Sequence, residues 1–240
     1  MTELLQKVRV IDPVSEIDEL FDVLIANGSI QAVASHIADI SPDTQIRDCQ
    51  GLVLGPGLVD LYSHSGEPGF EERETLLSLL ESAAAGGFTR VNILPDTSPA
   101  IDNPALVAQL QQKRREEMRE REKINLAPPT SPLPLLHLWG AITLDVAGKQ
   151  MTEFADLTSS GVVGFTDGKP FENLALVRRV LEYLQPLGKL VAFWPSDRQL
   201  SANGVMREGA DALRFGLPPI PASAETTAIA AMLELVAAIG

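Results

Sequence analysis

The sequence predicts an α/β protein in which a parallel sheet follows a strand-rich first segment. Residues up to about 55 consist of short β-rich runs separated by turn residues. From Gly55 onward, strand-like and helix-like patterns alternate, and we count five β/α units. Alternation of this kind is typical of strands joined by right-handed crossovers, which make a sheet parallel.

The first segment is predicted to be a small sheet. Its strand-like runs are VRVI (8–11), DVLIANGSIQAVAS (22–35) and TQIRDCQGLVL (44–54). The Asn27-Gly28 pair is the strongest short signal for a tight hairpin turn. A second pair of strands is expected around Gln50-Gly51. Residues 1–70 carry eleven acidic and three basic side chains, which we interpret as a solvated sheet face, with an acidic docking surface as the alternative.

Five further runs are predicted to form the parallel sheet. They are GLVDLYSH (57–64), TRVNILP (89–95), LLHLWGAIT (135–143), VVGFTDG (162–168) and KLVAFWP (189–195). Helical patterns follow them at 75–87, 103–125, about 151–160, 173–188 and 222–240. Paired glycines end the first helix, and Asn103 and Ser223 are candidate caps of the second and the last. From periodicity alone, the sheet is either doubly wound or part of a barrel.

One helix and the loop after it have unusual compositions. KRREEMREREK (113–123) is dense in charges of both signs, which indicates a solvated helix surface. LAPPTSPLP (126–134) is rich in proline and is predicted to be a stiff surface connector.

Composition excludes several classes of function. The 240 residues are 45% hydrophobic and 21% charged, as in ordinary globular proteins. A net charge of −13 disfavours nucleic-acid binding. The single cysteine, Cys49, rules out an internal disulfide and a cysteine zinc cluster. The start lacks a secretory pattern and no apolar run is long enough for a membrane span, so we expect a soluble cytoplasmic protein.

The densest cluster of candidate site residues lies in PGLVDLYSHSGEPG (56–69). Here a predicted strand ends in polar residues, and α/β folds bind ligands at the carboxyl ends of their strands. His64 could bind zinc there, although catalytic zinc usually has three protein ligands. The alternative is an ordinary polar side chain.

Other strand ends also carry polar residues. They are Asp96 and Thr97, Thr166 and Asp167, and Trp194, Ser196 and Asp197. Their convergence would make a small-molecule site, although turns also favour such residues. His36 and His137 are expected to be structural. The sequence contains no Walker phosphate loop, GxSxG elbow or HExxH motif.

Several blocks of the chain resemble dihydroorotases and related cyclic amidohydrolases. GLVLGPGLVDLYSHSGEPG is similar to the family strand that carries DxHxHxREPG. Further similar blocks follow the family order: RVIDP, SAAAGGFTRVNILPDTSPAIDN, GAIT, GVVGFTDGKP and GVMREGADALRFGLPPIPASAE, the first of them preceding the signature. The resemblance covers nearly the whole chain, which is identified as a member of this family.

The resemblance implies a fold and a reaction. The family fold is a (β/α)8 TIM-type barrel preceded by a small β-sandwich. We therefore expect a sandwich segment over 1–55 and a partial barrel of about five β/α units over 56–240. The family reaction is the reversible hydrolysis of dihydroorotate to carbamoyl-aspartate in pyrimidine synthesis, with a zinc-activated water and a carboxylate that transfers the proton.

The chain departs from the family at metal positions. Tyr62 replaces the first histidine of the HxH pair, and His64 is the second. Asp167 corresponds to the bridging aspartate region, and Trp194 replaces a later histidine. The resemblance therefore leaves His64 and Asp167 as metal ligands, and we expect zinc to be absent or weakly bound.

The substrate positions differ as well. Gly66 stands where the family has an arginine that grips the substrate carboxylate. Asp96 stands at a substrate-binding asparagine position and brings a negative charge toward an anionic substrate. No residue is assigned a catalytic role.

These departures leave three hypotheses, of which we favour the first. The chain is a non-catalytic structural subunit, with aspartate carbamoyltransferase or a second copy as its partner. Alternatively, it is an active amidohydrolase with a rebuilt site, acting on dihydroorotate, a hydantoin or allantoin, or it is a sensor of a pyrimidine intermediate. Because three family strands are missing after Gly240, we expect either a piece of a longer protein or completion of the barrel by another chain.

Overall fold

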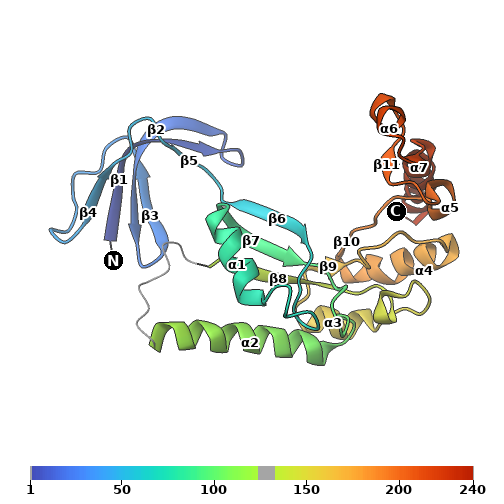
Figure 1. Ribbon diagram of the computed structural model, residues 1–240. Coiled ribbons are helices and arrows are strands. Elements are labelled where there is room, and N and C mark those ends of the chain that lie inside the picture. Colours follow the sequence, from blue (N-terminus) through green and yellow to red (C-terminus); the bar gives the residue numbers. More distant parts are fainter. Residues whose placement is uncertain (1, 124–132, 240) are drawn as a thin grey trace. The chain divides into compact units, whose positions relative to one another are not determined.

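The computed structural model describes residues 2–123 and 133–239 (Figure 1). The chain divides into two compact units, Met1–Gly57 and Leu58–Gly240. Most of the predicted proline-rich connector, residues 126–132, lies outside the described residues. No helix in the described ranges combines the length and the apolar character that crossing a membrane requires.

The first unit is a five-stranded sheet. Its strands are β1 (Thr2–Asp12), β2 (Ile17–Ala26), β3 (Ser29–Ala34), β4 (Gln45–Asp48) and β5 (Val53–Leu54). The order is β3-β2-β1-β4, with β5 also beside β1. The hairpin predicted at Asn27-Gly28 is confirmed, and both turn residues have positive φ. A small core of Val8, Val23 and Cys49 lies against the sheet.

The strand pair predicted around Gln50-Gly51 is wrong in its pairing. β4 and β5 both run parallel to β1 and do not pair with each other. The Cys49 amide donates to the Gln6 carbonyl at 2.8 Å, and the Arg9 amide donates to the Leu52 carbonyl at 3.1 Å. The chain therefore continues along β1 through this turn instead of folding back on itself.

The second unit contains a curled parallel sheet. Its strands are β6 (Leu58–Ser63), β7 (Phe88–Ile93), β8 (Leu135–Gly140), β9 (Gly164–Phe165) and β10 (Leu190–Val191). Their order, β10-β9-β8-β7-β6, follows the chain without reversal. A doubly wound sheet would reverse direction at a switch point. The five predicted strands and the partial barrel are thus confirmed.

Helices cover one face of this sheet. They are α1 (Leu76–Ala85), α2 (Pro104–Lys123), α3 (Phe154–Ser159) and α4 (Leu174–Leu184), with short 3-10 turns at η1 (Leu144–Val146) and η2 (Gln185–Leu187). Val91 and Ile93 of β7 belong to the buried cluster that the strands and helices share. Phe154 of α3 packs edge-to-face on Phe165 of β9, with 4.9 Å between the ring centroids. Alternate strand positions face the opposite side of the sheet, toward the interior of the partial barrel.

Helix ends test the predicted caps. Asn103 Oδ1 accepts a hydrogen bond from the Leu106 amide at 3.1 Å, so this cap is confirmed. Ser223 is already the first helical residue of its helix, because the Ala222 carbonyl accepts the first helical bond, from Thr226. The predicted Ser223 cap is therefore wrong by one residue. α3 begins at Phe154 instead of near Met151, since Met151 forms a β-bridge with Thr143.

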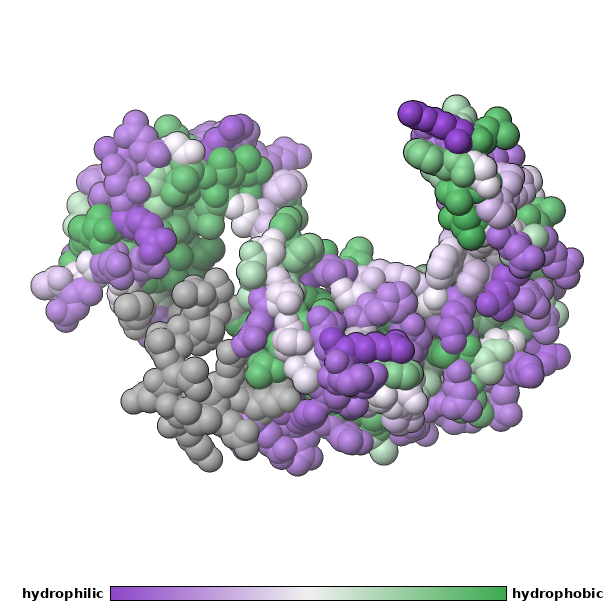
Figure 2. All heavy atoms as spheres, viewed as in Figure 1, coloured by the Kyte–Doolittle hydropathy of each residue, from purple (hydrophilic) through white to green (hydrophobic). Residues whose placement is uncertain are grey.

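The C-terminal segment adds short elements and one long helix. They are α5 (Arg198–Ser201), β11 (Met206–Arg207), α6 (Ala210–Phe215), β12 (Pro219–Ile220) and α7 (Ser223–Ile239). This segment is drawn in red in Figure 1. Figure 2 shows hydrophobic residues at its surface, and Leu213 and Phe215 are among the exposed ones.

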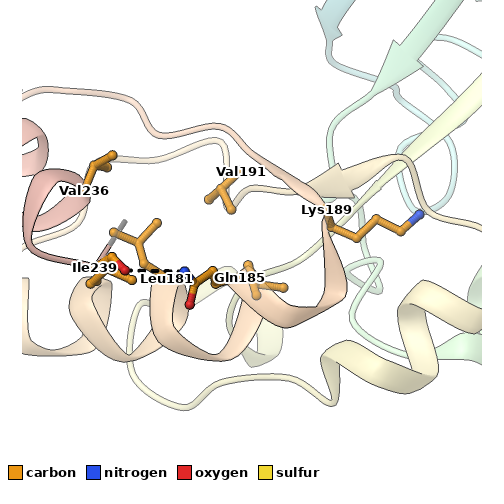
Figure 3. Close-up of a pocket in the computed structure, with 7 residues that line it drawn as sticks. Leu181, Gln185, Lys189, Val191, Val236 and Ile239 are labelled. Atoms are coloured by element: carbon orange, nitrogen blue, oxygen red, sulfur yellow. Dashed lines mark hydrogen bonds between the residues drawn. The ribbon is translucent and has the colours of Figure 1, made fainter.

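α7 packs against α4 and leaves a cavity of about 160 Å³ between them. Val236 and Ile239 face Leu181 and Gln185 across it, and Gln185 Nε2 donates to the Ile239 carbonyl at 3.4 Å (Figure 3). The cavity is lined mainly by aliphatic side chains, which indicates a packing gap between two helices.

Candidate functional site

Two predicted site residues meet at the carboxyl ends of β6 and β7. The register aligns Ser63 with Ile93, so the residues that follow each strand leave the sheet at the same edge. His64 Nδ1 lies 2.8 Å from Asp96 Oδ2. A carboxylate only accepts, so the imidazole donates this bond through Nδ1. The His64 side chain is 66% exposed and that of Asp96 is 20% exposed, so the pair lies open to solvent.

Asp167 lies in a different environment at the ends of β8 and β9. Its Oδ1 accepts hydrogen bonds from the Ile142 amide at 2.8 Å and the Thr143 amide at 2.9 Å. Its Oδ2 accepts from the Thr143 hydroxyl, which itself accepts from the Gly148 amide at 2.8 Å. Asp167 is only 2% exposed. The carboxylate therefore joins two strand ends and the loop that follows β8.

Burial decides the protonation behaviour of Asp167. Loss of solvent raises the pKa of this carboxyl above its ordinary value, although the bonds from Thr143 and Ile142 and the charge of Lys169 oppose the shift. A carboxyl whose charge is disfavoured and whose oxygens already accept three protein donors is a poor candidate to bridge metal ions.

The Tyr62 phenol is influenced by both aspartates, Asp96 and Asp167. Burial raises the pKa of its phenol, a hydrogen bond with Thr166 opposes this, and the charges of Asp96 and Asp167 raise it further. The phenol therefore lies within electrostatic reach of both aspartates and stays protonated at neutral pH. Tyr62 can donate a hydrogen bond, whereas an anionic phenolate ligand is disfavoured.

Gly66 is held where a side chain has no room. A Cβ atom there would stand 2.6 Å from the Glu74 carbonyl oxygen and 2.9 Å from that of Phe70. The Gly66 carbonyl accepts from the Phe70 amide at 2.7 Å, which keeps this turn tight. The arginine of the family pattern is thus missing, and the local backbone also excludes its return.

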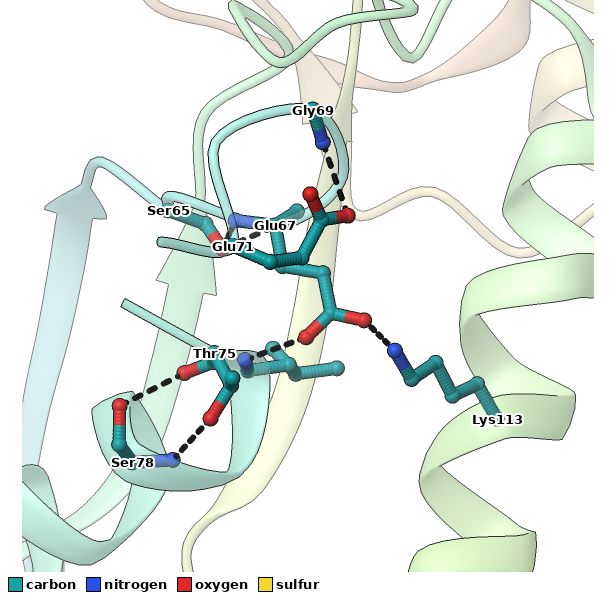
Figure 4. A network of polar contacts seen from close by, with 8 residues as sticks. Ser65, Glu67, Gly69, Glu71, Thr75, Ser78 and Lys113 are labelled. Atoms are coloured by element: carbon teal, nitrogen blue, oxygen red, sulfur yellow. Dashed lines mark hydrogen bonds and ion pairs between the residues drawn. The ribbon is translucent and has the colours of Figure 1, made fainter. Parts of the chain in front are cut away.

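Glu67 is a structural residue that the sequence analysis did not single out. It is 2% exposed, its Oε2 accepts from the Leu76 amide at 2.8 Å, and its Oε1 forms an ion pair with Lys113 of α2 (Figure 4). Thr75 caps α1, the helix that begins at Leu76, by accepting from the Ser78 amide. Its place within the candidate segment 56–69 was the available signal, and only the fold shows what it contacts.

Two further polar residues at the strand ends, Asp197 and Thr97, serve local structure. Asp197 caps α5 by accepting from the Gln199 and Leu200 amides at 2.8 and 2.9 Å. The Thr97 hydroxyl donates to the Pro99 carbonyl at 2.8 Å. Trp194, which stands at a family histidine position, is half exposed.

The other two histidines belong to other elements of the chain. His36 belongs to the first unit, where its Nδ1 lies 3.2 Å from Asp22. His137 is part of β8, and burial, followed by the charges of Arg90 and Arg114, lowers its pKa.

The residues at the strand ends do not fit a catalytic zinc centre. Such a centre takes three protein ligands and an open position. Across residues 2–123 and 133–239, no group of three or more His, Cys, Asp or Glu side chains is placed to hold a metal ion. His64 is bonded to Asp96, and Asp167 is bonded to Ile142 and Thr143.

Sequence comparisons identify relatives over the whole chain. A family model described as dihydro-orotase-like matches residues 51–240. A probable dihydroorotase-like protein from Synechocystis sp. is 39% identical over 98% of this chain and 55% of its own length. A dihydroorotase from Syntrophus aciditrophicus is 37% identical over 98% of this chain and 52% of its own. The chain thus spans about half the length of these relatives.

Solved structures share the fold. The L-hydantoinase of Arthrobacter aurescens has a TM-score of 0.71 at 19% identity, covering 99% of this chain and 51% of its own. The dihydropyrimidinase of Brevibacillus agri has a TM-score of 0.64 at 19% identity, covering 100% and 50%. The family model over residues 51–240, supported by the curated relatives at 37–39% identity, shows that the chain belongs to the dihydroorotase-like family.

Proposed function

We propose that this chain is a dihydroorotase-like protein that does not hydrolyse cyclic amides and acts as a non-catalytic structural subunit. The observation that carries the proposal is the environment of Asp167. Both of its oxygens are bonded to protein donors at the ends of β8 and β9, in a buried position. This aspartate has a structural role that is sufficient without any metal.

The supply of a nucleophile is the first point in support. Family hydrolysis needs a metal-bound hydroxide at neutral pH. His64 and Asp167 are the two expected ligands, and Tyr62, whose raised pKa keeps it a neutral phenol, is a weak substitute for an imidazole. The set of side chains at these strand ends does not match the ligand chemistry of zinc.

Substrate binding is the second point in support. Gly66 has no side chain with which to grip a carboxylate, and Asp96 places a negative charge at the same edge. A charge-assisted hydrogen bond of the lost kind contributes about 1.5–3 kcal/mol. The loss weakens binding of an anionic substrate at the family position by about tenfold or more.

A structural role requires a partner, and the family resemblance suggests two. They are aspartate carbamoyltransferase and a second copy of this chain. Co-purification and light scattering test both. A stable complex of either kind supports the proposal, whereas a monomer that captures no partner contradicts the structural part of it.

The catalytic part is tested by zinc content and turnover measured on one preparation. We expect less than stoichiometric zinc by elemental analysis, no hydrolysis of dihydroorotate, and no condensation of carbamoyl-aspartate. Treatment with a chelator should leave the melting temperature unchanged. The dihydroorotase of Syntrophus aciditrophicus, assayed in parallel, is the positive control. Stoichiometric zinc together with turnover would overturn the proposal.

One observation favours a second candidate, an active cyclic amidohydrolase with a rebuilt site. The Tyr62 phenol lies within electrostatic reach of Asp96 and Asp167, so several polar groups do gather at this edge. Under this candidate, Tyr62→Phe would abolish turnover on dihydroorotate or a hydantoin. Under the favoured proposal, neither the wild type nor the variant turns over.

A further inference from the structure

A small cavity beside Asp167 is lined by two cationic side chains. Its volume is about 50 Å³, and Gly148, Lys169, Phe171 and Arg198 are among its lining residues. We propose that this cavity binds the carboxylate group of a small organic acid, held between Lys169 and Arg198. The inference goes beyond the proposed function, because it concerns binding at a position other than the family's anion clamp.

The charges around the cavity favour an anion. Lys169 follows β9 in the loop that carries Asp167, and Arg198 begins α5, so two separate segments bring their cations to one place. Asp167 also lines the cavity, but its oxygens already accept bonds from Ile142 and Thr143. Within the described residues Asp167 forms no ion pair with Lys169 or Arg198, although the charge of Lys169 acts on its carboxyl.

Glu172 of the same chain is a weak competitor for Arg198. Arg198 Nη1 lies 3.5 Å from Glu172 Oε1, and the two side chains are 59% and 65% exposed. Exposed pairs at this distance are screened and contribute little. An incoming carboxylate can accept two bonds from the planar guanidinium fork, which is a stronger arrangement than the single contact with Glu172.

The size of the cavity limits the class of ligand. A volume of about 50 Å³ exceeds the roughly 10–15 Å³ that one water requires, and it suits a single carboxylate group. A second cavity of about 210 Å³ shares Phe171 and Arg198 with the first. Its polar lining includes Ser196 and Gln199 and also the acidic residues Glu172 and Asp197. The ligand class is therefore a small acid with a polar remainder.

The test is calorimetric titration of the full chain with three probes. Succinate and carbamoyl-aspartate carry the carboxylate, and succinamide is the matched neutral probe. We expect both acids to bind, succinamide not to bind, and affinity to fall as salt is raised. Lys169→Gln and Arg198→Gln should each raise Kd about 10-fold or more.

Two further variants sharpen the result. Glu172→Gln releases Arg198 and should tighten binding of both acids, an effect that general damage to the fold would not produce. Arg178→Gln is the charge-matched control, because Arg178 pairs with Glu182 on α4, and its Kd should match that of the wild type. Melting temperatures verify that each variant is folded.

The inference is overturned if the acids do not bind at millimolar concentration, if succinamide binds equally well, or if Lys169→Gln and Arg198→Gln bind like the wild type. These outcomes are separate from the proposed function. Turnover with bound zinc would end the proposed function and leave the binding result standing, whereas absent binding would end only this inference.

Discussion

Asp22 in the first unit and Asp167 in the second are two buried carboxylates with nearly the same set of donors. Asp22 is 4% exposed and accepts from the Lys7 and Ile37 amides and from His36. Asp167 is 2% exposed and accepts from two amides and a threonine hydroxyl. Each carboxylate joins segments that would otherwise separate.

Their pKa values nevertheless shift in opposite directions. Burial pushes the pKa of Asp22 upward, but the Lys7 and Ile37 amides and His36 outweigh it, so the net shift is downward. For Asp167, burial outweighs the bonds and the net shift is upward. His36 is 72% exposed beside Asp22, whereas Ile142 and Thr143 beside Asp167 are fully buried. The depth of the surroundings, more than the number of hydrogen bonds, decides the sign.

The largest effect is expected for Asp167→Ala. The variant removes the acceptor of the buried Thr143 amide and hydroxyl, and it leaves the Ile142 amide only its longer bond of 3.3 Å to the Thr166 carbonyl. The free energy of unfolding should therefore fall by about 3 kcal/mol. Urea unfolding measures this loss, and hydrogen exchange of the two amides locates it. Asp167→Asn keeps one carbonyl acceptor and should lose about half as much. A loss below about 1 kcal/mol for Asp167→Ala would contradict the structural role assigned to this residue.

A smaller effect is expected for Asp22→Ala. The Lys7 and Ile37 amides lose their acceptor, but Lys7 lies at an irregularity of β1 and Ile37 in the loop after β3, where water can replace the carboxylate. We therefore expect a loss of about 1–2 kcal/mol. Faster hydrogen exchange should be confined to these amides and their neighbours in β1 and β2. An effect as large as that of Asp167→Ala would break the comparison between the two sites.

The dependence of stability on pH should have opposite signs at the two sites. The stability that Asp22 contributes is present above the unfolded pKa of about 3.9 and is lost as the pH falls through its lowered folded pKa. The contribution of Asp167 is complete below about pH 3.9 and is lost as the pH rises through its raised folded pKa.

Asparagine variants make this prediction measurable. The free energies of unfolding of the wild type, Asp22→Asn and Asp167→Asn are measured from acid to neutral pH. The value of each variant is then subtracted from that of the wild type. The Asp22 difference should rise with pH and the Asp167 difference should fall, each by at most about 1.4 kcal/mol per pH unit. Two differences that change in the same direction with pH would contradict the assigned pKa directions.

The smallest effect is expected for His36→Ala. The imidazole is exposed, and Asp22 keeps its two amide donors, so the loss should stay below about 1 kcal/mol. His64→Ala is the matched variant, because His64 is also an exposed imidazole bonded to an aspartate. Thermal unfolding of the two variants should differ little, and a large loss for either would assign that histidine a role in stability.

Local patterns in the sequence predicted much of the fold. The Asn27-Gly28 hairpin, the five strands of the parallel sheet and the Asn103 cap follow from turn residues, periodicity and capping within a few residues. The pairing of residues 44–54 was mispredicted because β4 and β5 are each stabilised by distant β1. Pairing between distant segments leaves no local signal.

The candidate site was predicted in part. His64 and Asp96 were expected at one edge of the sheet, and they are bonded to each other. Glu67 was not singled out, since its contact with Lys113 joins a loop to a helix some forty positions later. The cationic pair Lys169 and Arg198 was also missed, because one residue lies in the loop after β9 and the other begins α5.

The order of strands and helices, the family and the replaced residues at Tyr62, Gly66 and Trp194 are determined by the sequence alone, because periodicity, turn chemistry and motif identity are local properties of the chain. The tertiary structure decided what the surviving residues do. Packing buried Asp167 against the Ile142 and Thr143 donors and left His64 in solvent. The exclusion of water and the reach of a hydrogen bond depend on segments that meet only in the folded chain.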